Sequence, residues 1–449
     1  MKTITLVLCL LLLPAILIAD DVAVTIYNSN LGVVSENRTL DFSKGIGQLD
    51  FKDVPSAIDA SSVTFDVIDK SGSVAILEQN YAYDLVSPEK IYSRYIDKGI
   101  DLIDKEGKLY SGNLLAYSSG AVTLKEKSGG IKIVQLVNIT EVNFPELPDG
   151  LITRPTLFWR YSSDHDGPLD CRVGYQTSGL SWSAEYIGVL SDDEDNLDLS
   201  GWSSITNNSG KTYKDATLKL VAGDIHRARP ERGRGMDMKM LSMAAPSDAG
   251  FEEKAFFEYH LYTLPRKATV ADKEIKQISL FEPASTTVEK KFIYRPDRNP
   301  KKVEVAINFT NSTAAGLGMP LPSGRVRLFK ADDDGSLILL GEDRIDHTPR
   351  DEELNIKVGY AFDIAAEERL MQRDKISNQV EDRTFEIELR NRKESSVIVK
   401  IEKKIWGFWE IVESDHPYIV KDAQTLQFDV PIEAGETIVV KFRIRFTQR

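Results

Sequence analysis

The chain has 449 residues, of which 42% are hydrophobic and 28% charged, and its formal net charge is −13. This acidic balance argues against a nucleic-acid-binding protein and against adsorption to an anionic membrane, because both depend on clustered lysine and arginine. No apolar stretch reaches the roughly 18–20 residues that a membrane-spanning helix requires. The length allows several domains, each with a substantial core.

Residues 1–19 have the features of a secretory signal peptide. Lys2 supplies the positive start, Leu6–Leu13 forms the apolar stretch, and Ala19 is a small residue at the expected cleavage site. We therefore expect an exported protein, located in the periplasm or outside the cell; the alternative is a segment retained as an anchor. Cys171 would be the one cysteine left after cleavage, so we expect neither an internal disulfide nor a zinc site built on cysteines.

Alternation of apolar and polar residues dominates the remaining sequence. In Thr437–Phe446 the residues Ile438, Val440, Phe442, Ile444 and Phe446 share one face, and the segments Thr384–Arg390 and Lys302–Phe309 follow the same scheme. Such alternation indicates strands with one face on a core and one in water, as in antiparallel sheets. We therefore predict a mainly β, multi-domain protein built of antiparallel β-sandwiches with very little helix.

One short helix is predicted after Ser87, which can cap it, with Pro88 in its first turn and an end near Gly99. Five short strands follow, at Ile100–Ile103, Gly112–Tyr117, Ala121–Lys125, Ile131–Leu136 and Ile139–Val142. A helix followed by five strands indicates a small barrel of the Sm or SH3 kind. Small barrels of this kind can bind RNA, but the acidic balance and the expected export argue against that role.

The proline-rich, polar stretch 144–150 predicts a domain boundary. We expect a signal peptide at 1–19, an N-terminal β domain at 20–85, the small barrel at 86–150 and a C-terminal β-sandwich domain at 151–449. Residues 227–250 combine four arginines with four methionines. This stretch is either a flexible insertion between strands or a loop that binds a partner.

Candidate chemistry is sparse. The sequence has no zinc-protease, serine-hydrolase, P-loop or dinucleotide-binding motif, and its five histidines are far apart. Residues 341–353 are the exception, with six carboxylates, two arginines and one histidine. We name Asp343, Asp346 and His347 as candidate binding residues, because carboxylates with an imidazole can hold a ligand or transfer protons. The alternative is an ion-paired turn that fixes the loop.

The second half of the chain, residues 155–449, resembles the C-terminal domain of prokaryotic mucoidy inhibitor A-like proteins, a domain of unknown function. The matching segments are Gly174–Tyr186, Gly201-Trp202, Asn207–Gly210, Asp215-Ala216, Leu220–Gly223, Phe257–Tyr259, Leu261-Tyr262, Lys276–Ile278, Leu321–Arg327, Gly341–Asp343, Asp346–Pro349 and Gly359–Asp363. Residues 22–85 are similar to the N-terminal β domain of the same family through Val24–Tyr27, Val54–Ser56 and Ile58–Val63.

The resemblance implies an exported, β-rich protein and brings no established catalytic residue. Many members of this family place a long coiled coil between the two β domains, where this chain has the predicted small barrel.

Three functions remain open from the sequence. The first is a non-enzymatic binding module of the cell envelope, with envelope proteins or polysaccharide as partners and no cofactor. The second is a metal-dependent or acid–base hydrolase that acts on envelope polysaccharide or peptide, supported by residues 341–353. The third is a structural oligomer subunit.

Overall fold

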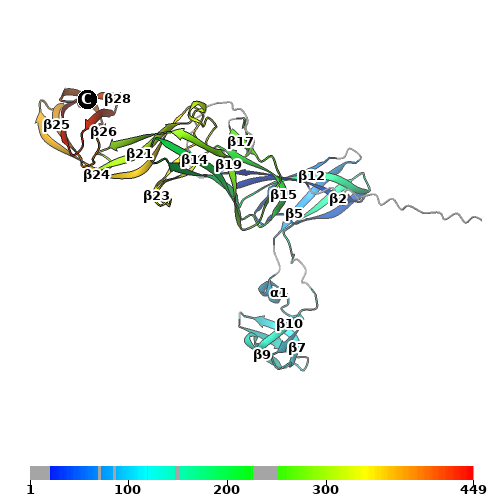
Figure 1. Cartoon of the computed structure of the whole chain (residues 1–449). Coiled ribbons are helices and arrows are strands. Elements are labelled where there is room, and N and C mark those ends of the chain that lie inside the picture. The colour runs from blue at the N-terminus through cyan, green and yellow to red at the C-terminus, as the bar shows by residue number, and fades with distance from the viewer. Residues whose placement is uncertain are drawn as a thin grey trace, which may run out of the picture.

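A computed structural model describes residues 21–68, 72–83, 87–118, 120–146, 152–223, 225, 251–257 and 259–447. The predicted mainly β class is confirmed, with 68% strand and 3% helix. Three bodies of sheet lie in a row and a smaller one lies to the side (Figure 1). The predicted signal peptide 1–19 and the predicted insertion 227–250 lie outside the described residues. No described helix is long and apolar enough to cross a membrane.

The first body is a sandwich of two sheets. Its eight-stranded sheet has the order β16-β17-β15-β1-β2-β12-β4, with β18 also paired to β15, and its second sheet has the order β3-β11-β5. The bounds are β1 Asp21–Tyr27, β2 Leu31–Phe42, β3 Gly45–Lys52, β4 Ile58–Val67, β5 Val74–Ala82, β11 Thr156–Ser163, β12 Gly167–Thr177, β15 Tyr213–Ala222, β16 Glu252–Phe256, β17 Tyr259–Thr263 and β18 Ala268–Val270.

Strands from both sides of residue 150 build this sandwich together. β1 pairs with β15 in parallel, β2 pairs with β12, and β11 lies between β3 and β5. Segments 20–85 and 151–449 therefore share two sheets. The small domain is inserted between the neighbouring strands β5 and β11, and leaves the sandwich continuous across it.

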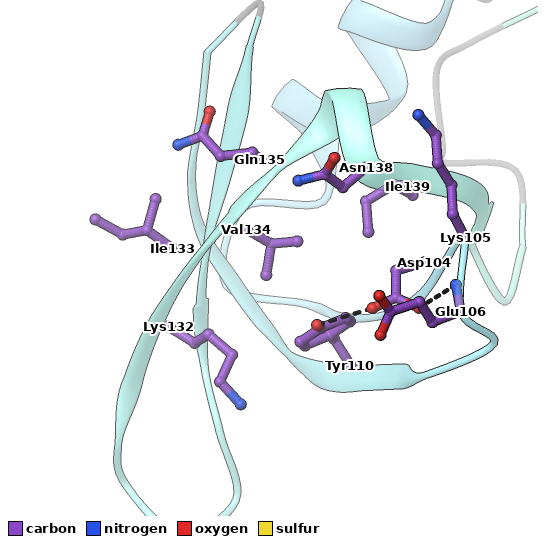
Figure 2. Close-up of a pocket in the computed structure, with 10 residues that line it drawn as sticks. All are labelled: Asp104, Lys105, Glu106, Tyr110, Lys132, Ile133, Val134, Gln135, Asn138 and Ile139. Carbon is purple, nitrogen blue, oxygen red and sulfur yellow. Dashed lines mark hydrogen bonds between the residues drawn. The ribbon is translucent and has the colours of Figure 1, made fainter.

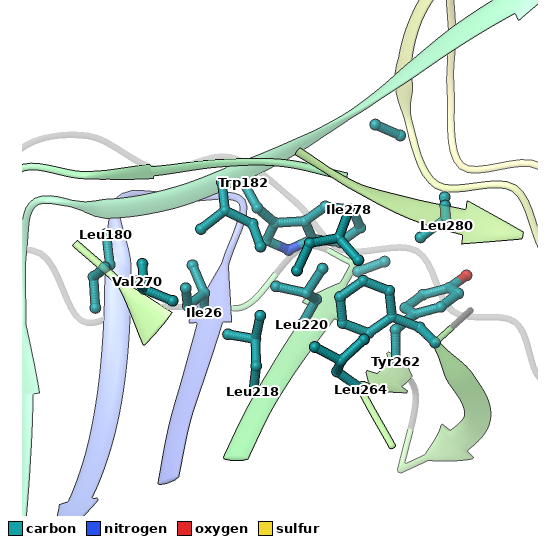
Figure 3. Close-up of a cluster of buried hydrophobic side chains, with 14 of the residues drawn as sticks. Ile26, Leu180, Trp182, Leu218, Leu220, Tyr262, Leu264, Val270, Ile278 and Leu280 are labelled. Atoms are coloured by element: carbon teal, nitrogen blue, oxygen red, sulfur yellow. The ribbon is translucent and has the colours of Figure 1, made fainter. Parts of the chain in front are cut away.

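The second body is a single five-stranded sheet with the order β19-β14-β13-β22-β23. Its strands are β13 Leu180–Leu190, β14 Asn196–Asn207, β19 Glu274–Thr287, β22 Gly324–Ala331 and β23 Leu337–Ile345. One apolar core joins this sheet to the first sandwich, and it includes Ile26, Trp182 and Leu220 (Figure 3). The indole Nε1 of Trp182 donates to the backbone oxygen of Val221 at 3.0 Å, so its polar atom is satisfied inside the core.

The third body is a nine-stranded sheet with the order β27-β30-β25-β24-β21-β20-β26-β29-β28 and its own core. Its strands are β20 Glu289–Tyr294, β21 Lys302–Thr310, β24 Glu353–Lys375, β25 Val380–Asn391, β26 Val397–Lys404, β27 Phe408–Ser414, β28 Ile419–Asp422, β29 Thr425–Ile432 and β30 Thr437–Thr447. The three strands predicted from alternation, in 302–309, 384–390 and 437–446, are confirmed as β21, β25 and β30.

Long strands connect the two cores. On β21, Ile307 and Phe309 belong to the first core, whereas Val303 belongs to the second. β24 does the same, with Ile356 in the first core and Ile364 in the second. Because the paired strands β21 and β24 pass from one core to the other, the second and third bodies are joined by continuous strands and not by a linker.

The small domain contains α1 Pro88–Arg94, a 3-10 helix at Leu136–Asn138, and the strands β6 Gly99–Asp104, β7 Leu109–Tyr117, β8 Ala121–Lys125, β9 Ile131–Gln135 and β10 Ile139–Asn143. The predicted helix is confirmed at its start, where Pro88 begins it and the Ser87 side chain accepts a hydrogen bond from the backbone N–H of Lys90. It ends at Arg94 and not near Gly99, which begins β6. The five strands form one sheet, β10-β6-β7-β8-β9. Among the described strand pairs none joins β9 to β10, so the expected small barrel is not closed by hydrogen bonds.

Candidate functional site

Asp343, the first predicted site residue, lies on β23 where this strand meets β24. Its Oδ2 accepts a hydrogen bond from the backbone N–H of Lys357 at 2.7 Å, and its Oδ1 accepts one from the N–H of Arg344 at 2.9 Å. A Cβ at Gly341 would lie 2.1 Å from the backbone oxygen of Val358, so only glycine allows the two strands to approach this closely. Asp343 therefore fastens the junction of two sheets.

Asp346 and His347 lie in the loop after β23, and both are exposed. The backbone oxygen of Asp346 accepts a hydrogen bond from Thr348 Oγ1 at 2.9 Å. The His347 Nδ1 accepts one from the backbone N–H of Ser323 at 3.1 Å. The structure thus places His347 against Ser323, and the Asp343 carboxylate is used at the strand junction.

A small cavity of about 50 Å³ lies beside His347 and is also lined by His260 and Tyr262. His260 Nδ1 lies 2.6 Å from Glu253 Oε1, and no motif in the sequence indicates this carboxylate–imidazole pair. Glu253 and His260 belong to the neighbouring strands β16 and β17, which register places side by side. A cavity of this size is far below the roughly 300–1,000 Å³ of ordinary small-molecule sites.

Ser323 and His347 raise the possibility of a serine nucleophile with a histidine base. The His347 Nε2 lies 3.4 Å from Ser323 Oγ. Because Nδ1 accepts a hydrogen bond from a backbone N–H, the neutral ring carries its proton on Nε2. This nitrogen then donates toward the Ser323 hydroxyl and does not accept its proton, so the pair does not have the arrangement of an activated nucleophile.

Metal chemistry has no visible site in the described part of the chain. No group of three or more His, Cys, Asp and Glu side chains is positioned there to hold a metal ion. Cys171 is buried, and burial raises the pKa of its thiol to about 11. A thiol in this state is a poor nucleophile at neutral pH, because the thiolate is the reactive form.

A buried charge cluster in the first sandwich was not predicted from the sequence. Glu36 is 1% exposed and accepts hydrogen bonds from Lys211 Nζ at 2.6 Å, from Arg38 Nε at 2.8 Å and from the Tyr175 hydroxyl. Burial opposes ionisation of Glu36, but Lys211 and Arg38 outweigh it and hold the pKa of this carboxyl below its usual value. All of the carboxylate is occupied by the protein itself, so this cluster is structural.

The small domain has a larger opening, of about 510 Å³, where the edges of its sheet face each other (Figure 2). Val134 of β9 and Ile139 of β10 lie on its two sides. Asp104 accepts hydrogen bonds from the Tyr110 hydroxyl at 3.0 Å and from the backbone N–H of Lys108 at 2.9 Å. These bonds, the backbone bond of Lys108 first, lower the pKa of Asp104 and keep it ionised.

Exposed aliphatic side chains lie on and just after β9, the strand that forms one side of this opening. Ile131 and Ile133 alternate along β9 and are 70% and 66% exposed, and Val137 in the following 3-10 helix is 73% exposed. β9 is an edge strand that pairs only with β8 among the described strands. We call Ile131, Ile133 and Val137 the β9 ridge.

No protein-family model matches the chain, and no curated protein matches it either.

Proposed function

We propose that the chain is an exported, non-enzymatic binding protein of the cell envelope, and that the small domain contacts a partner protein through the β9 ridge. The observation that carries this proposal is the edge strand β9, whose outer face presents two isoleucines to solvent beside a 510 Å³ opening. Apolar anchors next to a pocket are typical of the centre of a protein interface.

The β9 edge has little protection against pairing. Natural edge strands are usually blunted by charged residues, by proline or by a bulge. β9 has a single charged residue, Lys132, whose ammonium group pairs with Glu126 of the same hairpin. Its pairing with β8 is regular from Lys125 to Ala121, with no bulge. An unprotected apolar edge of this kind supports a surface that is covered by a partner.

Cross-linking in the native envelope, followed by affinity purification and mass spectrometry, tests the proposal. The double variant Ile131→Asp/Ile133→Asp is compared with Ile275→Asp, because Ile275 is 65% exposed on β19 in another sheet. We expect the double variant to lose the partner and Ile275→Asp to retain it. Retention of the same partner by a folded double variant would contradict the proposal.

A further inference from the structure

A groove in the first sandwich lies between the edge strands of its two sheets. β4 is the last strand of the eight-stranded sheet, and β5 is the last strand of the three-stranded sheet. They follow each other in the chain, yet β4 pairs only with β12 and β5 only with β11 among the described strands. The space between them has a volume of about 550 Å³.

The groove exposes part of the sandwich core. Val63 and Phe65 of β4 and Ile76 of β5 line it and are half-buried, although they point toward the core. Trp159 forms its floor, with the Phe65 ring edge-on at 5.5 Å. A ligand that covers these partly exposed apolar side chains gains binding free energy, since burying apolar surface is favourable.

A bulge in β5 helps to separate the two strands. Arg160 of β11 lies opposite Glu78, and the next residue, Tyr161, lies opposite Ile76, so Leu77 has no partner on β11. A bulge bends its strand and interrupts regular pairing along that edge, so an added strand would pair with β4 and lie against β5. Leu77 itself lines the groove and is 52% exposed.

The side chain of Gln79 crosses between the strands at one end of the groove. Its Nε2 donates to the backbone oxygen of Ala60 on β4 at 2.7 Å, and its Oε1 accepts from Trp159 Nε1 at 2.7 Å. The side-chain amide of Gln79 thus satisfies the backbone carbonyl of Ala60 on the β4 edge. Along the rest of this edge, the backbone N–H groups of a further strand could satisfy the carbonyls in the same way. The occupant that matches two facing strand edges is an extended peptide backbone.

The charge of the two strands indicates which peptide is favoured. β4 and β5 together carry Asp59, Asp66 and Glu78 and contain no lysine or arginine. Of these, only Glu78 lines the groove, and it pairs with Arg160 at 3.2 Å. Asp66 follows the groove-lining Phe65 and is exposed, so it lies on the outer face of β4, and no ion pair involves it among the described residues. A strand with basic residues between its apolar ones complements this surface.

We propose that the groove between β4 and β5 binds an extended, basic segment of another protein, which adds as a strand between the two sheets and places alternate apolar side chains over Trp159 and Phe65. This site is separate from the β9 ridge and does not depend on it.

A random peptide display library selected against the purified full chain tests the proposal. We expect enriched peptides to have apolar residues at alternate positions with lysine or arginine between them. Synthetic copies of these peptides are then titrated against Leu77→Lys and Ala75→Lys, which change exposed groove residues, and against Ile46→Lys. Ile46 is 68% exposed on β3, at the opposite edge of the same sheet, and receives the same charge.

The groove variants should weaken binding on the order of tenfold, while Ile46→Lys should leave it unchanged. Proline at central peptide positions should abolish binding, because an added strand needs its backbone N–H groups. The proposal is overturned if no peptide is enriched, if the groove variants bind normally, or if proline is tolerated. It is equally overturned if light scattering shows self-association that Leu77→Lys abolishes, since the strand would then come from a second copy.

Discussion

Gln79 Nε2 donates a hydrogen bond of 2.7 Å to the backbone oxygen of Ala60, and this bond joins two sheets that share no strand pair on that side among the described residues. The other amide atom, Oε1, accepts the indole N–H of the buried Trp159. One side chain therefore satisfies a strand edge and a core tryptophan together.

Replacing Gln79 by leucine should destabilise the first sandwich by about 1–3 kcal/mol, because the Trp159 N–H then loses its acceptor inside the protein. Urea unfolding followed by circular dichroism measures this change. Asn80→Ala, at the exposed neighbouring residue, is the control and should be nearly neutral. Equal stability of Gln79→Leu and the wild type would show that the bond contributes nothing.

Glu36 and Lys211 lie 175 positions apart in the chain, and their ion pair should make stability depend on pH. Glu36→Gln should cost about 3–5 kcal/mol at neutral pH, because it leaves the Lys211 ammonium buried without its counter-charge. The folded pKa of Glu36 is lowered, so its contribution is complete above the unfolded value of about 4.3 and is lost as the pH falls through the folded pKa.

Denaturant unfolding of the wild type and Glu36→Gln at a series of acidic pH values measures this dependence. The difference in unfolding free energy should shrink below about pH 4.3. A difference that stays constant through this range would mean that the carboxylate is not ionised in the folded protein.

Two glycines at the junction of β23 and β24 form a matched pair. A Cβ at Gly341 would lie 2.1 Å from the Val358 backbone oxygen, whereas a Cβ at Gly359 would meet nothing within 4 Å. Gly341→Ala should therefore destabilise the protein by about 1–3 kcal/mol and Gly359→Ala by much less. Thermal unfolding of both variants measures this, and equal melting temperatures would exclude a close approach of the strands.

The Ser87 cap offers a test confined to the small domain. Ser87→Ala should destabilise α1 by about 1 kcal/mol, because the Lys90 N–H loses its acceptor. Amide hydrogen exchange should be faster in α1 and at the packed residues Tyr92 and Tyr95. The exchange rates in the cores of the three bodies that lie in a row should be unchanged. Faster exchange throughout the chain would contradict an independently stabilised small domain.

Local patterns in the sequence were sufficient for the elements that depend on local physics. Alternation located β21, β25 and β30, and Ser87 followed by Pro88 located α1. The parallel pair β1–β15 and the position of β11 between β3 and β5 depend on contacts across more than 70 residues, which alternation does not encode. The division at residue 150 followed a composition break and could not reveal strands shared across it.

The same distinction between local and long-range signals applies to the candidate sites. The concentration of charged residues in 341–353 predicted a binding site there. The structure shows that the Asp343 carboxylate accepts hydrogen bonds from the backbone N–H groups of Arg344 and Lys357. The groove between β4 and β5 has no such signal, since its two strands alternate like any half-buried strand. The sheet order shows that both are edge strands among the described strands, and the groove that they line together shows that they face each other.

Site-specific photo-cross-linking at the β9 ridge tests whether this surface contacts a partner protein. A photoreactive phenylalanine analogue replaces Ile133 in one strain and the equally exposed Ile275 in another, and both are irradiated in intact cells. We expect a covalent adduct of defined mass from position 133 and none from position 275. No adduct at position 133, or the same adduct from both positions, would contradict this expectation.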